Sequence, residues 1–574
     1  MKIIAKSGKT DYTVLMSLYT NLETEFDYYP FEESEKNKGS IPSINTSVLN
    51  KITNQAFSTL SFTFTKEHIE NVIKAFNRKV ASRNDKYVCA SILKNAQIAA
   101  EKKFALCQDT GIANIYGWNN GLLLNSTGGK NAFTNIYEGA KDAYDKNNLR
   151  FSTSCAQNFY DEKDPKNNMP PQVAIFDSSA SLAPLPSFME SFVNEGKPAL
   201  GMIFCAKGGG SSNKTSFVQG TKAYLNPEKI RSFLKEQISH LGTSACPPYT
   251  LAFVAGGLSP EQNTLTLKLA TAGAYDKMTT EANPYGFRDK EIEKLMLQIA
   301  EETGYGAQFG GKCFALDAIA IRLPRHGASC PLSVGVSCSA HRNLKAVVTP
   351  DGFYLEKTAA EPQKIKGFNE AVEYLNSSGQ APSAASNSAQ KNFVVNTNDG
   401  IATTLQQLQD AKCGDRISLS GKILVARDAA HARWQKLIDS GKDLPEYTKQ
   451  YPICYAGPAR TPQGSVIGSF GPTTAGRMDV YAESLMSRGA ALVTLAKGNR
   501  SRMWQDACKK YNAFYLGTPG GIAALIASSY ILDQKIVDYE DLGMEAVRLI
   551  TVKDLPCFVL TDKDGNDFYS NCGQ

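Results

Sequence analysis

Short apolar strands alternate with amphipathic helices in the last third of the chain, and this alternation limits the fold more than any other feature. Residues 417–426 are rich in Ile, Leu and Val and predict a strand, followed by a helix over 429–439 with Asp428 as its N-cap. A helix over 478–488 and strands over 490–496 and 513–517 come next. The pattern predicts an α/β layer whose strands are largely parallel.

Basic and hydroxyl side chains follow the carboxyl ends of these strands: Arg427, Thr473, Thr474, Arg477, Lys497 and Arg500. Ligands of open α/β sheets bind beyond the carboxyl ends of the strands, and helix N-termini in such a crevice favour negative charge. The sequence therefore predicts a cleft for a carboxylate or phosphate. The alternative for each basic residue taken alone is a solvated surface charge.

A run of small polar residues over 376–390 divides the chain. It contains one Pro and no large apolar side chain, which is typical of a flexible linker. We therefore expect an N-terminal domain over 1–375, in which amphipathic helical patterning runs over 65–102, and a C-terminal domain over 391–574.

Composition and charge exclude several classes of protein. A net charge of +6 on 574 residues is mild, and lysines alternate with acids along the chain, unlike the basic surface of a nucleic-acid-binding module. No stretch approaches 18 consecutive apolar residues, and the N-terminal segment lacks the apolar core of a secretory signal. We expect a soluble, cytoplasmic protein, in which 13 cysteines do not form a disulfide framework.

A glycine-rich loop over 206–215 follows an apolar strand over 199–205. It nearly matches the phosphate loop of nucleotide hydrolases, but Asn213 occupies the position of the second required Gly. This argues against nucleotide hydrolysis. The adjacent glycines indicate either a close approach of the backbone to a ligand carboxylate or a sharp turn without function.

Cysteine spacing alone does not define a metal site, since no two cysteines have the local spacing of a zinc or ferredoxin motif. Cys107, Cys246, Cys330 and Cys338 occur in turn-rich segments and either converge on a cluster or are small buried side chains. His326 and His431 are candidates for proton transfer, with a packed structural histidine as the alternative for each.

Taken together and in order, the motifs resemble those of the class I fumarate hydratases, the iron–sulfur type, as a single chain. The resemblance covers about residues 55–570. It rests on the segments 106–111 (LCQDTG), 207–214 (KGGGSSNK), 242–248 (GTSACPP), 306–311 (GAQFGG), 322–331 (RLPRHGASCP), 455–458 (YAGP), 471–479 (GPTTAGRMD) and 495–500 (LAKGNR).

The resemblance implies an N-terminal α/β cluster-binding domain and a C-terminal swivelling β/α domain. It also implies a [4Fe-4S] cluster held by Cys107, Cys246 and Cys338, with one iron lacking a protein ligand, whereas Cys330 matches a family cysteine that is not a ligand. The open iron would act as a Lewis acid toward the substrate's hydroxyl and the adjacent carboxylate.

The matching catalytic residues are Thr473, as the base on C3 of malate, and Asp109 with His326, as the pair that manages the proton of the leaving hydroxyl. The matching substrate contacts are Gln108, Arg150, Gly210, Arg427, Thr474, Arg477 and Lys497. The reaction expected by resemblance is the reversible, stereospecific hydration of fumarate to L-malate by a homodimer that binds neither nucleic acid nor membrane.

Two alternatives stay open at this stage. One is the same chemistry on L-tartrate or mesaconate (methylfumarate), and the other is an iron–sulfur sensor without catalysis. The sequence also departs from the family pattern, since His341 stands where the family usually has Asp, within a few residues of Cys338.

Overall fold

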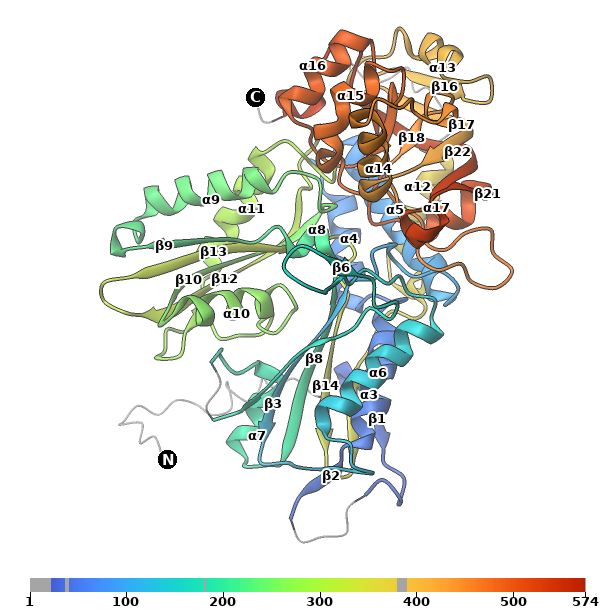
Figure 1. Ribbon diagram of the computed structural model, residues 1–574. Helices are drawn as coiled ribbons and strands as arrows, with labels where there is room; N and C mark the ends of the chain where they lie inside the picture. Colours follow the sequence, from blue (N-terminus) through green and yellow to red (C-terminus); the bar gives the residue numbers. More distant parts are fainter. Residues whose placement is uncertain (1–21, 37–40, 180–181, 379–389, 573–574) are drawn as a thin grey trace.

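The computed structural model describes residues 22–36, 41–179, 182–378 and 390–572. Helices and strands alternate along most of this range, and three large sheets form the framework (Figure 1). The α/β class expected from the sequence is confirmed. In the described part of the chain, no helix is both long and apolar enough to cross a membrane.

The first sheet has six strands in the order β1-β15-β14-β8-β3-β7. Its central strand β8 is buried along its whole length, as an apolar strand covered on both faces should be. Helices α3 and α6 pack on one face of the sheet and α7 on the other. The bounds are β1 Phe26–Pro30, β15 Gly352–Glu356, β14 Asn343–Thr349, β8 Ala199–Lys207, β3 Ile112–Asn120, β7 Gln172–Asp177, α3 Ser47–Leu60, α6 Ala132–Lys146 and α7 Ser187–Asn194.

The second sheet has five strands in the order β11-β12-β10-β13-β9. Helices α9 and α11 cover one face and α10 covers the other, where it faces the first sheet (Figure 1). The bounds are β11 Phe287–Arg288, β12 Ala315–Arg325, β10 Tyr249–Gly257, β13 Cys330–Ser337, β9 Ser216–Gly220, α9 Pro227–Leu241, α10 Pro260–Ala270 and α11 Lys290–Glu302.

The third sheet has seven strands in the order β16-β17-β18-β19-β20-β22-β21. Strands β16 to β20 pair in parallel, and β22 runs antiparallel to its neighbours, so the prediction of largely parallel strands is confirmed. The bounds are β16 Asn392–Asn396, β17 Arg416–Val425, β18 Ile453–Cys454, β19 Val493–Ala496, β20 Phe514–Gly517, β21 Ile531–Asp538, β22 Val547–Thr561, α13 Ile401–Leu408, α14 Asp428–Asp439, α15 Ala482–Met486, α16 Arg502–Tyr511 and α17 Ala523–Ser529.

Helices α4 (Lys66–Asn77), α5 (Arg83–Ala100) and α12 (Phe368–Ser378) join the third sheet to the rest, because their apolar side chains share one hydrophobic core with it. Polar contacts add to this packing: Asn95 accepts a hydrogen bond from the backbone of Leu525 at 3.0 Å. The third sheet is thus docked on the N-terminal helices.

Several local predictions can be compared with these elements. The helical pattern over 65–102 forms α4 and α5, and Thr65 caps α4 by accepting a hydrogen bond from the backbone N–H of His68. The start of the predicted linker, 376–378, is the last turn of α12, and residues 379–389 lie outside the described residues.

Two predictions at the third sheet are wrong in detail. The N-cap of α14 is Arg427, not Asp428, because the carboxylate of Asp428 instead pairs with the side chains of Arg427 and Arg477. The helix expected over 478–488 begins as a 3₁₀ helix, Ala475–Tyr481, and α15 is short. Contacts with the loop after β19 hold this segment, since Asp479 accepts hydrogen bonds from Arg500 and from the backbone of Ser501.

Candidate active site

One edge of the first sheet collects the turns that carry the expected site residues. β3 and β14 begin at this edge and β8 ends there, since Ile112 pairs with Lys207 and Asn343 with Cys205. The chain enters β3 from the turn that contains Cys107. It leaves β8 through the glycine-rich loop toward β9, and it passes from β13 to β14 through residues 338–342.

A cavity of about 350 Å³ lies where this edge meets the third sheet. Its lining is polar and combines thiols, cations, hydroxyls and glycine backbone: Cys107, Gln108, Asp109, Arg150, Gly208, Gly209, Gly210, Ser211, Asn213, Lys214, Ser244, Ala245, Cys246, Cys338, Ala340, Arg342, Arg427, Thr473, Thr474, Arg477, Lys497 and Gly521. Every residue that the resemblance placed in the site is among them except His326. Arg500, expected at the same strand ends, does not line the cavity, because it is buried and its Nε donates to Asp479.

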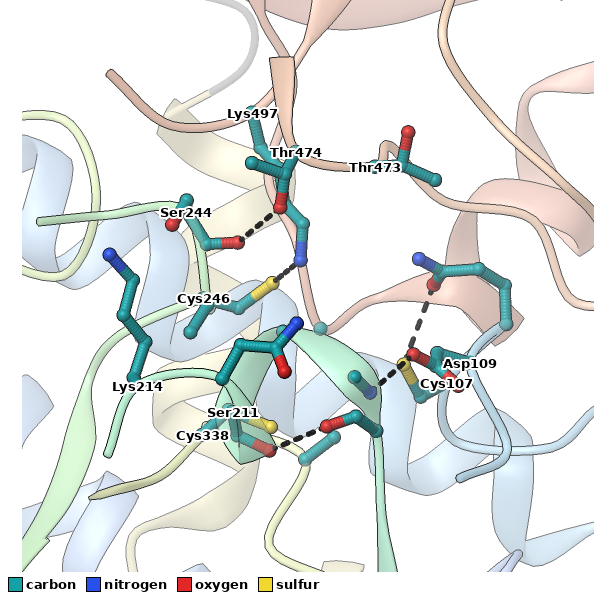
Figure 2. A pocket seen from close by; sticks show the side chains of 18 of the residues that line it. Cys107, Asp109, Ser211, Lys214, Ser244, Cys246, Cys338, Thr473, Thr474 and Lys497 are labelled. Carbon is teal, nitrogen blue, oxygen red and sulfur yellow. Dashed lines mark hydrogen bonds between the residues drawn. The ribbon is translucent and has the colours of Figure 1, made fainter. Parts of the chain in front are cut away.

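Three thiols meet at this cavity although they are far apart in the sequence (Figure 2). Cys107 precedes β3, Cys246 lies between α9 and β10, and Cys338 follows β13; the first two are buried and the third is half-buried. Among the described residues, no three His, Cys, Asp or Glu side chains form a group that could hold a single metal ion. Thiolates are the protein ligands of iron–sulfur clusters, so these three thiols are the residues of the cavity that could hold such a group.

The backbone around Cys246 is specialised. Its φ of +63° lies in the left-handed region that few side chains adopt, and such conformations occur where the surroundings enforce them. A Cβ at Gly520 would lie 2.2 Å from Sγ of Cys246, so only glycine fits beside this thiol. Both features fix the direction of the sulfur toward the cavity.

Cations counter the cost of burying these thiols. Nζ of Lys497 donates to Sγ of Cys246 at 2.6 Å. Burial raises the pKa of the Cys246 thiol to about 11, and the nearby ammonium of Lys497 acts in the opposite direction. Burial also raises the pKa of Cys107, and there the guanidinium of Arg342 is the largest opposing influence.

Asp109 is held as a carboxylate. Its oxygens accept hydrogen bonds from the backbone N–H groups of Gly209 at 3.0 Å and Gly111 at 3.3 Å, and Nη2 of Arg150 lies 3.0 Å from Oδ1. Burial alone would raise its pKa, but Arg150, Arg342 and the two N–H donors outweigh burial and lower the pKa to about 2. A Cβ at Gly208 would lie 2.9 Å from Oδ2, so the glycine-rich loop approaches this carboxylate as closely as it can.

Thr473 and Thr474 enter the cavity from the segment before the 3₁₀ helix. Oγ1 of Thr473 donates to the carbonyl of Tyr455 at 3.2 Å, and Oγ1 of Thr474 donates to the carbonyl of Ser244 at 3.4 Å. Thr474 also forms a parallel bridge with Lys497, which places both threonines beside the carboxyl end of β19. The strand-end location predicted for these residues is therefore found in the fold.

Three of the four arginines that line the cavity contact an acidic partner. Arg150 donates to the carbonyl of Gly457 at 3.0 Å in addition to its contact with Asp109. Arg427 contacts Asp428 at 3.0 Å and Glu545 at 3.2 Å, and Arg477 contacts Asp428 at 3.4 Å. Arg427, Arg477 and Lys497, which the sequence predicted at the strand ends, therefore line one cavity.

Two further expected contacts are well defined. Gln108 donates through Nε2 to the carbonyl of Pro472 at 3.2 Å, and a Cβ at Gly471 would lie 2.5 Å from its Oε1. Gly210 lies in the short helix α8 (Gly209–Ser212) and presents backbone rather than a side chain to the cavity.

The two candidate histidines lie elsewhere. His326 is exposed in the turn between β12 and β13, outside the cavity lining. His431 is buried among Trp434, Tyr455 and Tyr481, its Nδ1 lies 3.0 Å from the carbonyl of Arg427, and burial lowers its pKa to about 4. This favours the packed structural alternative for His431.

His341, the departure noted in the sequence, lies outside the cavity lining but next to the Cys338 turn. Its ring stacks on His68 with centroids 5.4 Å apart, and its Nδ1 lies 2.6 Å from Oγ of Ser337. Nε2 of His68 lies 2.9 Å from the carbonyl of Ser339. The two rings thus contact the residues on both sides of Cys338.

Sequence reasoning missed two cations of the cavity, Arg342 and Lys214. Both occur in motifs that the sequence displays, four residues after Cys338 and at the end of the glycine-rich loop. Nothing in their spacing marks them as cavity residues, because their position depends on how the chain crosses between the first two sheets.

Comparison with known protein families and proteins gives a consistent result. Residues 50–347 match the family model described as fumarate hydratase (Fumerase), and residues 368–572 match the one described as fumarase C-terminus. The chain is 42% identical to "Fumarate hydratase class I, aerobic" of Salmonella typhimurium, over 99% of this chain and 91% of that protein. It is also 42% identical to "Fumarate hydratase class I, anaerobic" of Escherichia coli (98% and 94% covered) and to "Fumarate hydratase 2" of Leishmania major (92% and 87%).

Proposed function

Because the chain belongs to the class I fumarate hydratase family and is therefore a hydro-lyase, we propose that it catalyses the reversible, stereospecific hydration of fumarate to L-malate in the cavity of Figure 2. The observation that carries this proposal is the meeting of three thiols, the carboxylate of Asp109, the hydroxyl of Thr473 and several cations around one cavity of about 350 Å³.

The cofactor that we propose is a [4Fe-4S] cluster held by Cys107, Cys246 and Cys338. These residues fit the group because they offer three thiols at one polar cavity, with cations beside them that favour the thiolate form. When bound, the cluster supplies a Lewis acid at the iron without a protein ligand, which makes hydroxide a better leaving group.

The cations bind the two carboxylates of the substrate. Arg427, Arg477 and Arg150 are pre-oriented by their acidic and carbonyl partners, so little side-chain freedom remains to be lost on binding. Lys497 lies between the thiol of Cys246 and the threonine segment, next to where the substrate would meet the cluster. Gln108, Thr474 and the backbone of Gly210 complete the proposed contacts.

Thr473 is the proposed base that takes the proton from C3 of malate and returns it in the hydration direction. Threonine takes up this proton as its alkoxide, and because a hydroxyl is a very weak acid, the alkoxide needs electrostatic support. Arg427 and Lys497 line the same cavity and supply positive charge there, and the hydroxyl is buried away from bulk water.

Asp109 is the proposed acceptor for the proton of the water that adds to fumarate, and in the reverse direction it returns this proton to the departing hydroxyl. Its low pKa keeps it ionised at neutral pH, and its hydrogen bonds fix both oxygens. His326, its proposed partner, lies at the far end of β13, which spans eight residues before Cys338. At about 3.3 Å per residue this is roughly 25 Å, so the His326 of the same chain cannot reach the cavity.

We therefore propose that a second copy of the chain supplies His326, in a homodimer. The exposure of the β12–β13 turn supports this, since an exposed histidine can reach the cavity of a neighbouring subunit.

We also propose that residues 1–375 and 391–574 are two domains, joined by a linker over 376–390, and that the second swivels to close over the substrate. The cavity lining supports this because it is drawn from both parts. Small-angle scattering with and without L-malate tests it: a more compact particle in malate is expected, and an unchanged profile would contradict it.

The function itself is tested anaerobically. The protein is reconstituted with iron and sulfide, and the ultraviolet absorbance of fumarate is followed with L-malate, L-tartrate and mesaconate assayed in parallel. We expect turnover of malate and fumarate that disappears in air together with the cluster absorbance. If the cluster forms and only tartrate or mesaconate is turned over, that compound replaces fumarate as the proposed substrate. A cluster with no turnover would indicate a sensor. If no cluster forms, the proposal is overturned.

A further inference from the structure

Arg342 is a buried cation for which neither the fold nor the proposed substrate contacts account. It is the last residue before β14, in the segment that begins at Cys338, and its exposed fraction is only 4%. Its Nε donates to the carbonyl of Ala340 at 3.3 Å, while no group in the described part of the chain accepts a hydrogen bond from its Nη1. A buried charged donor without an acceptor is unfavourable unless a bound group accepts its hydrogen bond.

Other cations of the cavity differ from Arg342 because each contacts an acidic side chain. Arg150, Arg427 and Arg477 each contact a carboxylate, and Lys497 contacts a thiol. Those four also suffice for the two carboxylates of a small substrate. Lys214 also lines the cavity, but its Nζ donates to the carbonyl of His240. Among the cations of the described cavity, Arg342 is therefore the one with a buried donor that has no acceptor.

The neighbours of Arg342 identify what it faces. Arg342 lines the same cavity as Cys107, Cys338 and Asp109. The two thiols and then this carboxylate are also the groups whose charge favours the guanidinium most. Burial would lower the pKa of the guanidinium, but these groups together raise it. Lys497 is the cation that contacts Cys246. Arg342 is then the cation for the other two thiols.

We propose that Arg342 is a positioning residue for the bound cluster, in which its Nη1 donates a hydrogen bond to a sulfur on the side of Cys107 and Cys338. This inference rests on the proposed cluster-dependent function. A [4Fe-4S]²⁺ core with three thiolates carries a net charge of about −1, and one more electron makes it more negative. A buried guanidinium hydrogen-bonded to sulfur stabilises that charge, so Arg342 raises the reduction potential and strengthens retention of the cluster.

The test compares anaerobically reconstituted wild type, Arg342→Gln and Arg342→Lys. Reduction potentials are measured by redox titration followed by electron paramagnetic resonance, and iron per chain is measured after dialysis against a chelator. We expect Arg342→Gln to have a lower potential than wild type and to lose iron at least three times faster, with KM for malate changed less than twofold. Arg342→Lys keeps the charge without the planar guanidinium. Its reduction potential and its rate of iron loss should lie between those of wild type and Arg342→Gln.

Arg416→Gln is the matched control. Arg416 is also partly buried, with an Nε that has no hydrogen-bond partner, but it lies on β17 outside the cavity lining and donates to Asn84. Its substitution should leave potential and iron loss at wild-type values even if it lowers stability.

The outcomes separate the inference from the proposed function. If wild type binds a cluster and both Arg342 variants match its potential and iron retention, the inference is wrong. A KM raised more than tenfold at unchanged potential would make Arg342 a substrate ligand and also overturn it. If Arg342→Gln does not fold, Arg342→Lys with a wild-type potential and iron loss overturns it instead. If wild type itself takes up no cluster, the proposed function has failed.

Discussion

Nζ of Lys497 lies 2.6 Å from Sγ of Cys246, although 251 positions separate the two residues. Cys246 lies just before β10 of the second sheet, and Lys497 directly follows β19 of the third sheet. Their contact therefore joins the two sides of the cavity. Burial would lower the pKa of Lys497, but its thiol neighbours, Cys246 first, raise it. The ammonium is thus kept charged at the boundary between the thiols and the substrate cations.

The first prediction concerns this pair. Lys497→Met keeps the length of the side chain but removes its charge, so kcat/KM for malate should fall by at least about 100-fold because stabilisation of developing negative charge is lost. Iron per chain should fall as well, since Cys246 loses its cation. Steady-state kinetics and iron analysis check this, with Lys412→Met as control because Lys412 is exposed and its ammonium pairs with Asp564 at the surface, outside the cavity lining. Wild-type kcat/KM in Lys497→Met would contradict the role.

The second prediction separates the base from the cluster. Thr473→Ala should lower kcat by at least about 100-fold while the iron content and visible absorbance stay at wild-type values. Thr473→Ser restores a hydroxyl and should recover part of the activity. Loss of exchange of the C3 proton of malate with deuterated solvent, followed by NMR, identifies the step. If Thr473→Ala exchanges this proton at the wild-type rate, another residue is the base.

The third prediction tests the ligand assignment. Cys338→Ala should abolish cluster absorbance and activity. Cys330→Ala should keep both, because Cys330 is fully buried in β13 and does not line the cavity. The two substitutions remove the same thiol group at the two opposite ends of β13, so each serves as the other's control. Loss of the cluster in both variants would contradict the assignment.

Sequence reasoning located part of this site from physical rules alone. The strand-end rule placed Arg427, Arg477 and Lys497 in one crevice, because the parallel strands β17 to β20 end at the same edge. It could not bring Cys107, Cys246 and Cys338 together, since their meeting depends on how the chain crosses between the first and second sheets. Only the resemblance to a known family supplied that grouping.

Other features depend on tertiary contacts that no local pattern encodes. The 3₁₀ helix at 475–481 arises where Asp479 is bound by Arg500, against the local preference for a longer α-helix. The separation of His326 from Asp109 follows from the length of β13, and the buried position of Arg342 follows from the crossing into β14. These are consequences of topology rather than of composition or periodicity.

The fourth prediction follows from the pKa of Asp109, which is about 2 in the folded protein against an ordinary value of 3.8. Because this pKa is lower in the folded than in the unfolded protein, the carboxylate stabilises the fold at any pH above the unfolded pKa. This contribution is about 2 kcal/mol and is lost as the pH falls from about 4 toward 2. Asp109→Asn should therefore be less stable than wild type by about this amount at pH 7, and the difference should narrow below pH 4.

Urea unfolding at pH 7, 4 and 3 measures this difference. Asp564→Asn is the control, because that carboxylate is exposed and its substitution should change the midpoint little. A difference between wild type and Asp109→Asn that stays constant down to pH 3 would show that the carboxylate is not stabilised by Arg150 and the two backbone N–H donors.

The last prediction tests whether His326 acts across a subunit boundary. His326→Ala and Thr473→Ala should each be nearly inactive as homodimers. In a mixed dimer of the two, the cavity of the His326→Ala chain keeps its own Thr473 and receives an intact His326 from the other chain, so one of two cavities is complete. Co-expression with two different affinity tags and sequential purification isolates this mixed dimer, which should recover about half of the wild-type kcat per dimer. If instead His326 served its own chain's cavity, both cavities of the mixed dimer would lack a residue. The recovered activity would then be no greater than the sum of the two inactive parents, because neither chain could complete the other.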